Sequence, residues 1–213
     1  MDYIDEEYTL AEEIFNSISH GIGALLAIAG CIVIIVLTAL NKVAIEVVSV
    51  SIYGASLIIL YSMSTLYHAF TNKTVKNVFK ILDYNTIFLL IAGSYTPFTL
   101  CCIGGALGWT IFGIIWGVAA VGIVLSSVNL NKFRKYSTIC YISMGWGIVL
   151  AIKPLYDSLP KESFIMLIAG GLIYSFGVIF FSKDFKYAHS IWHIFVLAGS
   201  ILHYFSILKA VLS

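Results

Sequence analysis

Seven long, predominantly apolar stretches constrain this chain more than any other feature of its sequence. A helix needs about 20 apolar residues to cross the hydrocarbon core of a bilayer, where an unpaired backbone has no water to bind. Stretches of suitable length run over residues 16–40, 44–70, 78–101, 107–127, 136–152, 163–181 and 189–212. We therefore predict an all-α protein, an integral membrane bundle of seven transmembrane helices.

The connectors between these stretches are short and polar, so they leave no room for a second, soluble domain. Hydrophobic residues make up 60% of the chain and charged residues 11%, against roughly 25% charged residues in an ordinary soluble domain. We expect an acidic N-terminal segment over 1–15 and one seven-helix domain over 16–213. The break at Gly104-Gly105 rests only on the two glycines and on length, and without it the count falls to six.

The distribution of basic residues predicts how the bundle is oriented. Connectors and helix ends on the N-terminal side hold eight lysines and arginines, and the opposite side holds four. The eight are Lys73, Lys76, Lys80, Lys132, Arg134, Lys135, Lys183 and Lys186. Because cytoplasmic loops of membrane proteins carry the excess of lysine and arginine, we predict a cytoplasmic N-terminus and a C-terminus outside.

Two classes of function lack support in the composition. A net charge of +1 leaves no basic surplus to neutralise phosphates, so we expect no nucleic-acid partner. The four cysteines lie in or beside apolar stretches without CxxC spacing, which predicts neither a disulfide framework nor a thiolate zinc site. We interpret them as small apolar residues.

Ionisable side chains inside a membrane are costly, and for that reason they are candidates for function. Those within or beside the predicted spans are His20, Glu46, His68, Asp83, His189, His193 and His203. Five of the seven fall at the predicted cytoplasmic ends of four different spans, namely His20, His68, Asp83, His189 and His193. Because this shared level was not used to orient the chain, it is separate evidence for a common site.

The spacing within this set favours a metal site. His189 and His193 are four residues apart, which places both imidazoles on one face of a helix. His68, on another helix, could complete a set of three histidines and leave a fourth position for water, as in catalytic zinc sites. Asp83 could hydrogen-bond that water, and Ser64 lies one turn before His68 on the same face.

Each of these histidines also has a purely structural interpretation. A single histidine at a helix end is more often an interfacial or hydrogen-bonded residue than a metal ligand, and only the set of three changes that balance. His20 is open to both interpretations, as a neighbour of the site or as a structural residue. His203 lies 14 residues beyond His189, about 21 Å further along a helix, so we expect it outside the site, as an outer-leaflet or interfacial residue.

The motifs, taken in order, resemble the hemolysin III proteins. These belong with the progestin and adipoQ receptors and, more distantly, with the alkaline ceramidases. The motifs are Glu13-x-x-Asn16-x-x-x-His20, Ser64-x-x-x-His68, Asp83, the segment AGSYTPF at 92–98, and His189-x-x-x-His193. They cover nearly the whole chain, each on the corresponding span.

The resemblance implies a seven-helix bundle in a bacterial plasma membrane. It further implies zinc held by His68, His189 and His193, with a water near Asp83. The ceramidase-like relatives suggest zinc-dependent hydrolysis of a lipid amide or ester, in which Asp83 moves a proton and Ser64 assists by hydrogen bonding. Glu13, Asn16 and His20 would then surround the ligands. The name of the family suggests cytolysis instead.

Three functions follow as hypotheses. The first is a zinc-dependent hydrolase that takes an acyl lipid from within the inner leaflet, with membrane lipids as its partners. The second is a non-catalytic sensor or regulator of the membrane, in which zinc clamps the second and seventh helices together. The third is a hemolysin-type cytolytic protein, which the uniformly apolar stretches disfavour because they are typical of resident spans. Haem-based electron transfer fits less well, since HxxxH on one helix beside an aspartate favours zinc.

Overall fold

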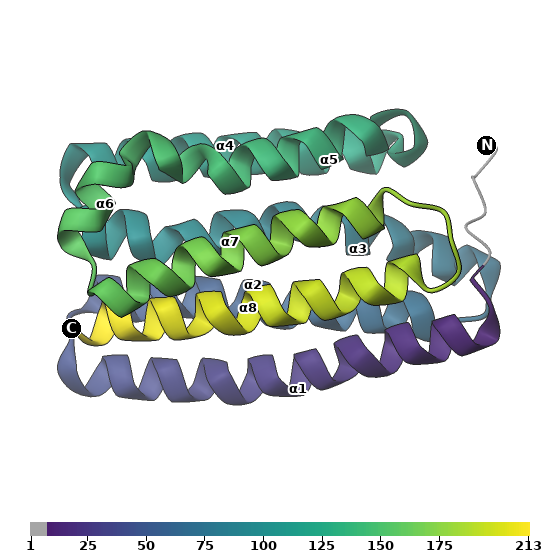
Figure 1. Ribbon diagram of the computed structural model, residues 1–213, viewed down its shortest axis with the longest axis horizontal. Coiled ribbons are helices and arrows are strands. Elements are labelled where there is room, and N and C mark those ends of the chain that lie inside the picture. Colours follow the sequence, from purple (N-terminus) through teal and green to yellow (C-terminus); the bar gives the residue numbers. More distant parts are fainter. Residues whose placement is uncertain (1–7) are drawn as a thin grey trace.

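The computed structural model describes residues 8–213, so residues 1–7 of the predicted acidic segment lie outside the described residues. All its regular structure is helical (Figure 1). The elements are α1 (Leu10–Asn41), α2 (Ala44–Ala69), α3 (Lys73–Pro97), η1 (Phe98–Ile103), α4 (Gly105–Val128), α5 (Leu130–Trp146), η2 (Gly147–Ala151), α6 (Ile152–Ser158), α7 (Lys161–Phe181) and α8 (Ala188–Leu212).

These elements form seven spans long and apolar enough to cross a membrane, as the sequence predicted. The π-helix η1 continues α3 after Pro97, whose ring cannot continue α-helical hydrogen bonding. The 3-10 helix η2 joins α5 to α6, so that Leu130–Ser158 is one span. The break at Gly104 and Gly105 is real, since both residues adopt positive φ angles of 63° and 53° that a glycine accommodates readily.

Three helices begin at least five residues earlier than predicted, because each has an N-cap among its polar residues. Thr9 and Glu12 form a capping box that starts α1 at Leu10 rather than at 16. The Asn72 side chain accepts hydrogen bonds from the first turn of α3, and Asn129 caps α5. Segments expected to be connectors are therefore first turns of helices.

Neighbouring helices in the sequence pack together, and α8 closes the bundle by packing on α7 and against α1. The odd number of spans puts the start of α1 and the end of α8 at opposite ends of the molecule (Figure 1). We call these the α1-start end and the α8-finish end. Large apolar side chains remain exposed along α1 and α4, including Leu25, Ile32, Val121 and Val124. Such surfaces suit contact with lipid.

The interior contains hydroxyl groups that link the helices. The Tyr61 hydroxyl on α2 donates to Ser200 Oγ on α8 at 2.7 Å, and Tyr204 of α8 donates to the Gly30 carbonyl of α1 at 3.0 Å. Hydrogen bonds of this kind satisfy polar groups that lipid could not solvate. They fix α8 against α1 and α2, the two helices that carry the rest of the candidate site.

Candidate metal centre

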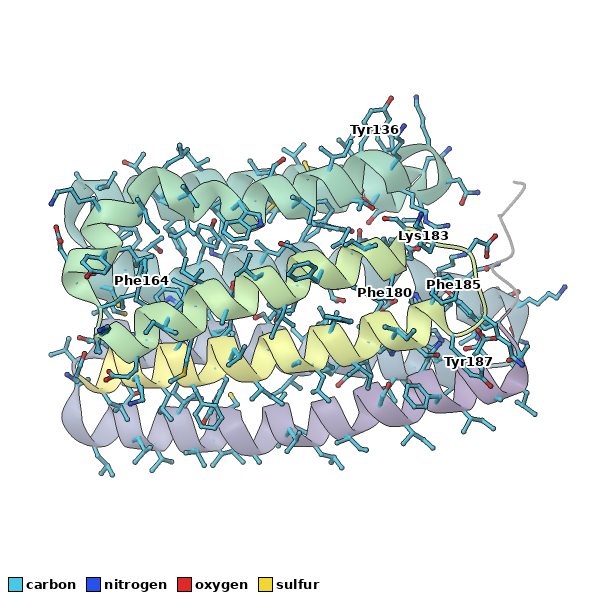
Figure 2. The ribbon with its side chains drawn as sticks, viewed as in Figure 1. Tyr136, Phe164, Phe180, Lys183, Phe185 and Tyr187 are labelled. Carbon is cyan, nitrogen blue, oxygen red and sulfur yellow. The ribbon has the colours of Figure 1, made fainter. Side chains whose placement is uncertain are left out.

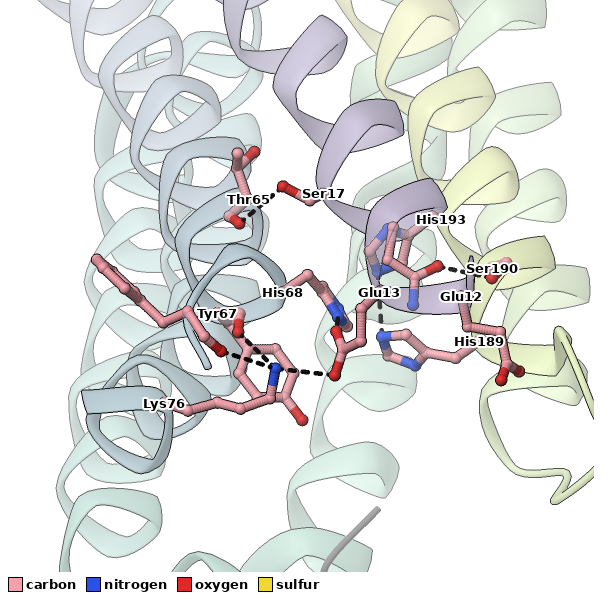
Figure 3. Close-up of polar contacts among 12 residues, drawn as sticks. Glu12, Glu13, Ser17, Thr65, Tyr67, His68, Lys76, His189, Ser190 and His193 are labelled. Carbon is pink, nitrogen blue, oxygen red and sulfur yellow. Dashed lines mark hydrogen bonds and ion pairs between the residues drawn. The ribbon is translucent and has the colours of Figure 1, made fainter. Parts of the chain in front are cut away.

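Three histidines from two helices meet at the α1-start end of the bundle. His68 lies one residue before the end of α2, and His189 and His193 lie on the first turns of α8. One ligand atom of each lies within 4.8 Å of the others (Figure 3). His68 and His193 are buried, and His189 is partly exposed. The predicted set of three therefore comes together closely enough to bind a metal ion.

Glu13 of α1 orients the His68 ring. The His68 Nδ1 atom lies 2.6 Å from the Glu13 Oε2 carboxylate oxygen, which can only accept when ionised, so Nδ1 carries the proton (Figure 3). The lone pair is then on Nε2, which is buried and has no hydrogen-bond partner among the described residues. When a carboxylate accepts the N–H of one ring nitrogen, it fixes the tautomer of the histidine and makes the other nitrogen a more basic metal ligand.

The His193 ring has a polar contact at each of its two nitrogen atoms. Its Nδ1 atom lies 3.3 Å from the Ser19 hydroxyl of α1, and its Nε2 atom lies 3.1 Å from Nε2 of His189. The ring stacks on His20 with centroids 3.5 Å apart and planes 9° from parallel. His20, also on α1, therefore lies directly beside the three histidines. Its ring also packs edge-on against Tyr61.

One pair of donor atoms has the spacing that a zinc ion requires. Zinc–nitrogen bonds of about 2.0–2.1 Å in a tetrahedron put two ligand nitrogens about 3.3 Å apart, close to the His189–His193 spacing. The Ser64 hydroxyl is also buried without a hydrogen-bond partner in the described part of the chain, as is the His68 Nε2 atom. Orphaned buried groups are rare in folded proteins, and here several lie on the residues predicted to surround an ion.

One charged residue of the site, Lys76, was not predicted. Its ammonium group lies 2.8 Å from Glu13 Oε1, and it donates to the carbonyls of Tyr67 at 3.0 Å and Phe70 at 3.3 Å (Figure 3). Lys76 thus joins the end of α2 to the carboxylate that orients His68. The sequence held only a general signal, a basic residue shortly after a helix that ends in a candidate ligand.

The other predicted residues take different places. Asn16 is fully buried, and its Oδ1 atom accepts a hydrogen bond from Ser190 of α8 at 2.7 Å. Asp83 is half-buried on α3, ten residues after that helix begins, and the group of three ligand atoms does not include it. It lies further along its helix than expected because Asn72 starts α3 early. The roles assigned to Asp83 and Ser64 stay predictions.

His203 lies outside the group, as expected. It faces α7, where its Nε2 atom lies 3.3 Å from the Leu167 carbonyl and its ring packs edge-on against Tyr174. It is an interhelical packing residue in the interior of the bundle rather than an interfacial one.

A largely apolar cavity of about 130 Å³ lies between α5 and α7 and reaches inward to α2, α3 and α8. Phe181 and Trp192 line it near the histidines, and Leu167 and His203 line it deeper in the bundle. Trp192 directly precedes His193. None of the three histidines lines the cavity, but it extends to Phe181, whose ring centroid lies 6.2 Å from that of His189.

Comparisons with known proteins agree with this architecture. The family model described as "Haemolysin-III related" matches residues 8–204. The chain is 47% identical to "Hemolysin-3" of Bacillus cereus over 202 residues, which cover 94% of this chain and 92% of that protein. It is 43% identical to "Hemolysin-3 homolog" of Bacillus subtilis (strain 168), with 94% and 95% covered.

A human protein is more distantly similar. The chain is 32% identical to human "Monocyte to macrophage differentiation factor" over 171 residues, 77% of this chain and 71% of that one. With seven apolar helices and bacterial relatives matched over nearly their whole length, the chain is a multi-pass integral membrane protein. It belongs to the haemolysin-III related family.

Proposed function

We propose that this protein is a zinc-dependent membrane hydrolase that cleaves the amide or ester bond of an acyl lipid. The observation that carries the proposal is the convergence of His68, His189 and His193, with the protonated side of His68 turned toward Glu13. Three neutral imidazoles around an open position are typical of catalytic zinc sites, whereas structural zinc sites are closed by four protein ligands.

The protein's own residues supply binding, orientation and proton transfer. A bound zinc would polarise the scissile carbonyl and lower the pKa of a bound water. Glu13 holds His68 in its ligand tautomer, and Lys76 holds Glu13 in place. We assign Asp83 the removal of a proton from water and its delivery to the leaving group. Ser64, whose hydroxyl has no hydrogen-bond partner among residues 8–213, donates a hydrogen bond to the developing negative charge.

The cavity between α5 and α7 supports a lipid substrate. Its walls are largely apolar, and it approaches the histidines at Phe181 and Trp192. An acyl chain in this cavity would bring the carbonyl at its end toward the metal. The excess of basic residues at the α1-start end favours a cytoplasmic location for that end, so the lipid would come from the inner leaflet.

The first experiment compares metal content and lipid cleavage in the same purified samples. Wild type, a variant with His68, His189 and His193 all changed to alanine, and Glu162→Gln as a control at an exposed residue away from the site are incubated with mixed ceramides and phospholipids. We expect about one zinc per chain and released fatty acid in wild type and Glu162→Gln, and neither in the triple variant. Zinc without fatty-acid release would favour a non-catalytic regulator, and absence of zinc from wild type would refute the site.

Asp83→Asn separates metal binding from chemistry. Asparagine keeps the shape of the side chain but cannot accept a proton near neutral pH, so we expect full zinc content and loss of fatty-acid release by at least about 100-fold. Elemental analysis and a turnover assay on the same preparation check this. Undiminished turnover in the variant would remove Asp83 from the mechanism.

A further inference from the structure

A second hollow, of about 500 Å³, opens beside His189 at the α1-start end. Its walls come from three parts of the chain that are far apart in sequence. Tyr8, Thr9 and Glu12 belong to the start of α1, Arg134 belongs to the second turn of α5, and residues 180–186 include the connector between α7 and α8. Unlike the cavity between α5 and α7, this hollow is lined mainly by polar atoms.

Three permanent cations line this hollow, and we call it the basic hollow. They are Arg134, Lys183 and Lys186. Lys183 lies near the end of α7 that faces α5, and Phe185 and Tyr187 lie further along the same connector (Figure 2). The hollow also holds the carboxylates of Glu12 and Asp184. The cations thus outnumber the anions, and they reach the hollow from two different elements.

The Glu12 carboxylate is already engaged within the protein. Its Oε1 atom accepts the Tyr187 N–H at 2.6 Å, and its Oε2 atom accepts from the Thr9 N–H at 2.9 Å and the Thr9 hydroxyl at 2.7 Å. Glu12 therefore fixes the connector against α1 and shapes the hollow. Its hydrogen-bonding capacity is used internally. Neither Lys183 nor Lys186 forms an ion pair with another described residue, so these two ammonium groups remain to bind an anion from outside.

Phe181 lines both the basic hollow and the apolar cavity. The Arg134 guanidinium lies 6.0 Å from the Phe181 ring centroid, and the His189 ring lies 6.2 Å from it on ring centroids. The apolar cavity, one of the three histidines and a cation of the basic hollow thus all adjoin Phe181. An amphiphile with one acyl chain and an anionic headgroup would place these two parts on either side of this ring.

We infer that the basic hollow binds the phosphate group of an anionic lipid whose acyl chain occupies the cavity between α5 and α7. Lysine and arginine bind phosphate through charge-assisted hydrogen bonds, and basic pockets at the ends of transmembrane helices bind anionic headgroups. This inference rests on the proposed function for the place of the acyl chain. It names the substrate class as lipids that carry a phosphate.

General attraction to an anionic membrane is the simpler explanation for basic residues at this end, and the chain offers a matched control for it. Lys132 and Lys135 are exposed at the same end, on the same first turns of α5 as Arg134, and they do not line the basic hollow. Replacing two lysines inside the hollow and two outside it removes the same charge. A bound headgroup distinguishes the pairs, whereas a diffuse surface potential does not.

The test measures binding by the full-length protein in neutral detergent, with three probes. These are a monoacylglycerol phosphate, the corresponding monoacylglycerol, and inorganic phosphate. They are compared on wild type, Lys183→Gln/Lys186→Gln and Lys132→Gln/Lys135→Gln, by thermal stabilisation and by titration at two salt concentrations. Because binding is measured rather than turnover, a protein that binds without cleaving would overturn the proposed function and leave this inference standing.

We expect wild type to bind the monoacylglycerol phosphate about tenfold or more tightly than the monoacylglycerol, with weaker binding at high salt. The Lys183/Lys186 variant should lose about tenfold of that affinity, and the Lys132/Lys135 variant less than about twofold. Equal losses in the two variants, or equal affinity of wild type for the two lipids, would overturn the inference. Inorganic phosphate that stabilises wild type as strongly as the lipid would reassign the hollow to a soluble anion.

Discussion

The two ends of α8 use histidine in opposite ways. At the start of the helix, His189 and His193 meet His68 of α2 within a network anchored on α1. Ten residues after His193, His203 turns toward a backbone carbonyl of α7 and packs on Tyr174. Both environments are sheltered, so burial alone does not distinguish a ligand from a packing residue. The difference lies in how many helices bring imidazoles and carboxylates to one point.

The largest expected effect is that of His193→Ala. Removing this ligand leaves an incomplete set, and we expect zinc content to fall from about one per chain to near zero, with a lower melting temperature. The matched variant His203→Ala should keep its zinc, because His203 takes no part in the group. Elemental analysis of both detergent-purified variants checks the comparison. Full zinc occupancy in His193→Ala would refute the ligand assignment.

Glu13→Gln should weaken the site without removing a ligand. The neutral amide no longer holds the proton on His68 Nδ1 by charge, and losses of this kind cost about 10–100-fold in metal affinity. Competition with a chelator of known affinity measures the change. Glu162→Gln, which removes one exposed carboxylate at the other end of the bundle, serves as the control. Equal chelator resistance in the two variants would contradict the role given to Glu13.

Lys76→Met should have a smaller effect, because Lys76 acts on the metal only through Glu13. We expect metal affinity to fall by about three- to tenfold, with partial recovery in Lys76→Arg, which restores the charge next to Glu13. Lys73→Met removes an exposed lysine from the same turn of α3 and should leave affinity unchanged. The same chelator competition applies. A stability loss without any change in affinity would limit Lys76 to capping α2.

Gly170→Ala should affect the His203 region alone. A Cβ atom at Gly170 would lie 2.3 Å from Cδ2 of His203, so α7 and α8 would have to move apart or the ring would have to turn. Forced repacking of this kind costs about 1–3 kcal/mol. We expect a lower melting temperature with unchanged zinc content. A loss of zinc from this variant would mean that the two ends of α8 are coupled.

The fold was largely predictable from the sequence, because span number depends on the length of apolar stretches that no soluble fold would expose. Helix starts were predicted less well. The first turns of α1, α3 and α5 carry charged residues that resemble connectors, and only the caps at Thr9, Asn72 and Asn129 show where the helices begin. Hydropathy alone does not distinguish a polar capping residue from a polar residue in a connector.

The site was predictable to the extent that it lies along single helices. The four-residue spacing of His189 and His193 fixes their shared face, and the level of His68 in the bundle follows from its place at the end of a span. Lys76 was not predictable, because its contact with Glu13 depends on how the connector from α2 to α3 turns. Spacing likewise says nothing about the stacking of His20 on His193.

The arrangement of ligands on α2 and α8 has a consequence for the order in which the protein matures. About 120 residues separate His68 from His189, which at synthesis rates of about 5–20 residues per second is roughly 6 to 24 seconds of translation. During that interval the growing chain carries His68 and Glu13 without the other two histidines. Under the proposed function, metal loading would follow synthesis of the last helix, and a chain truncated before that helix would have an incomplete centre.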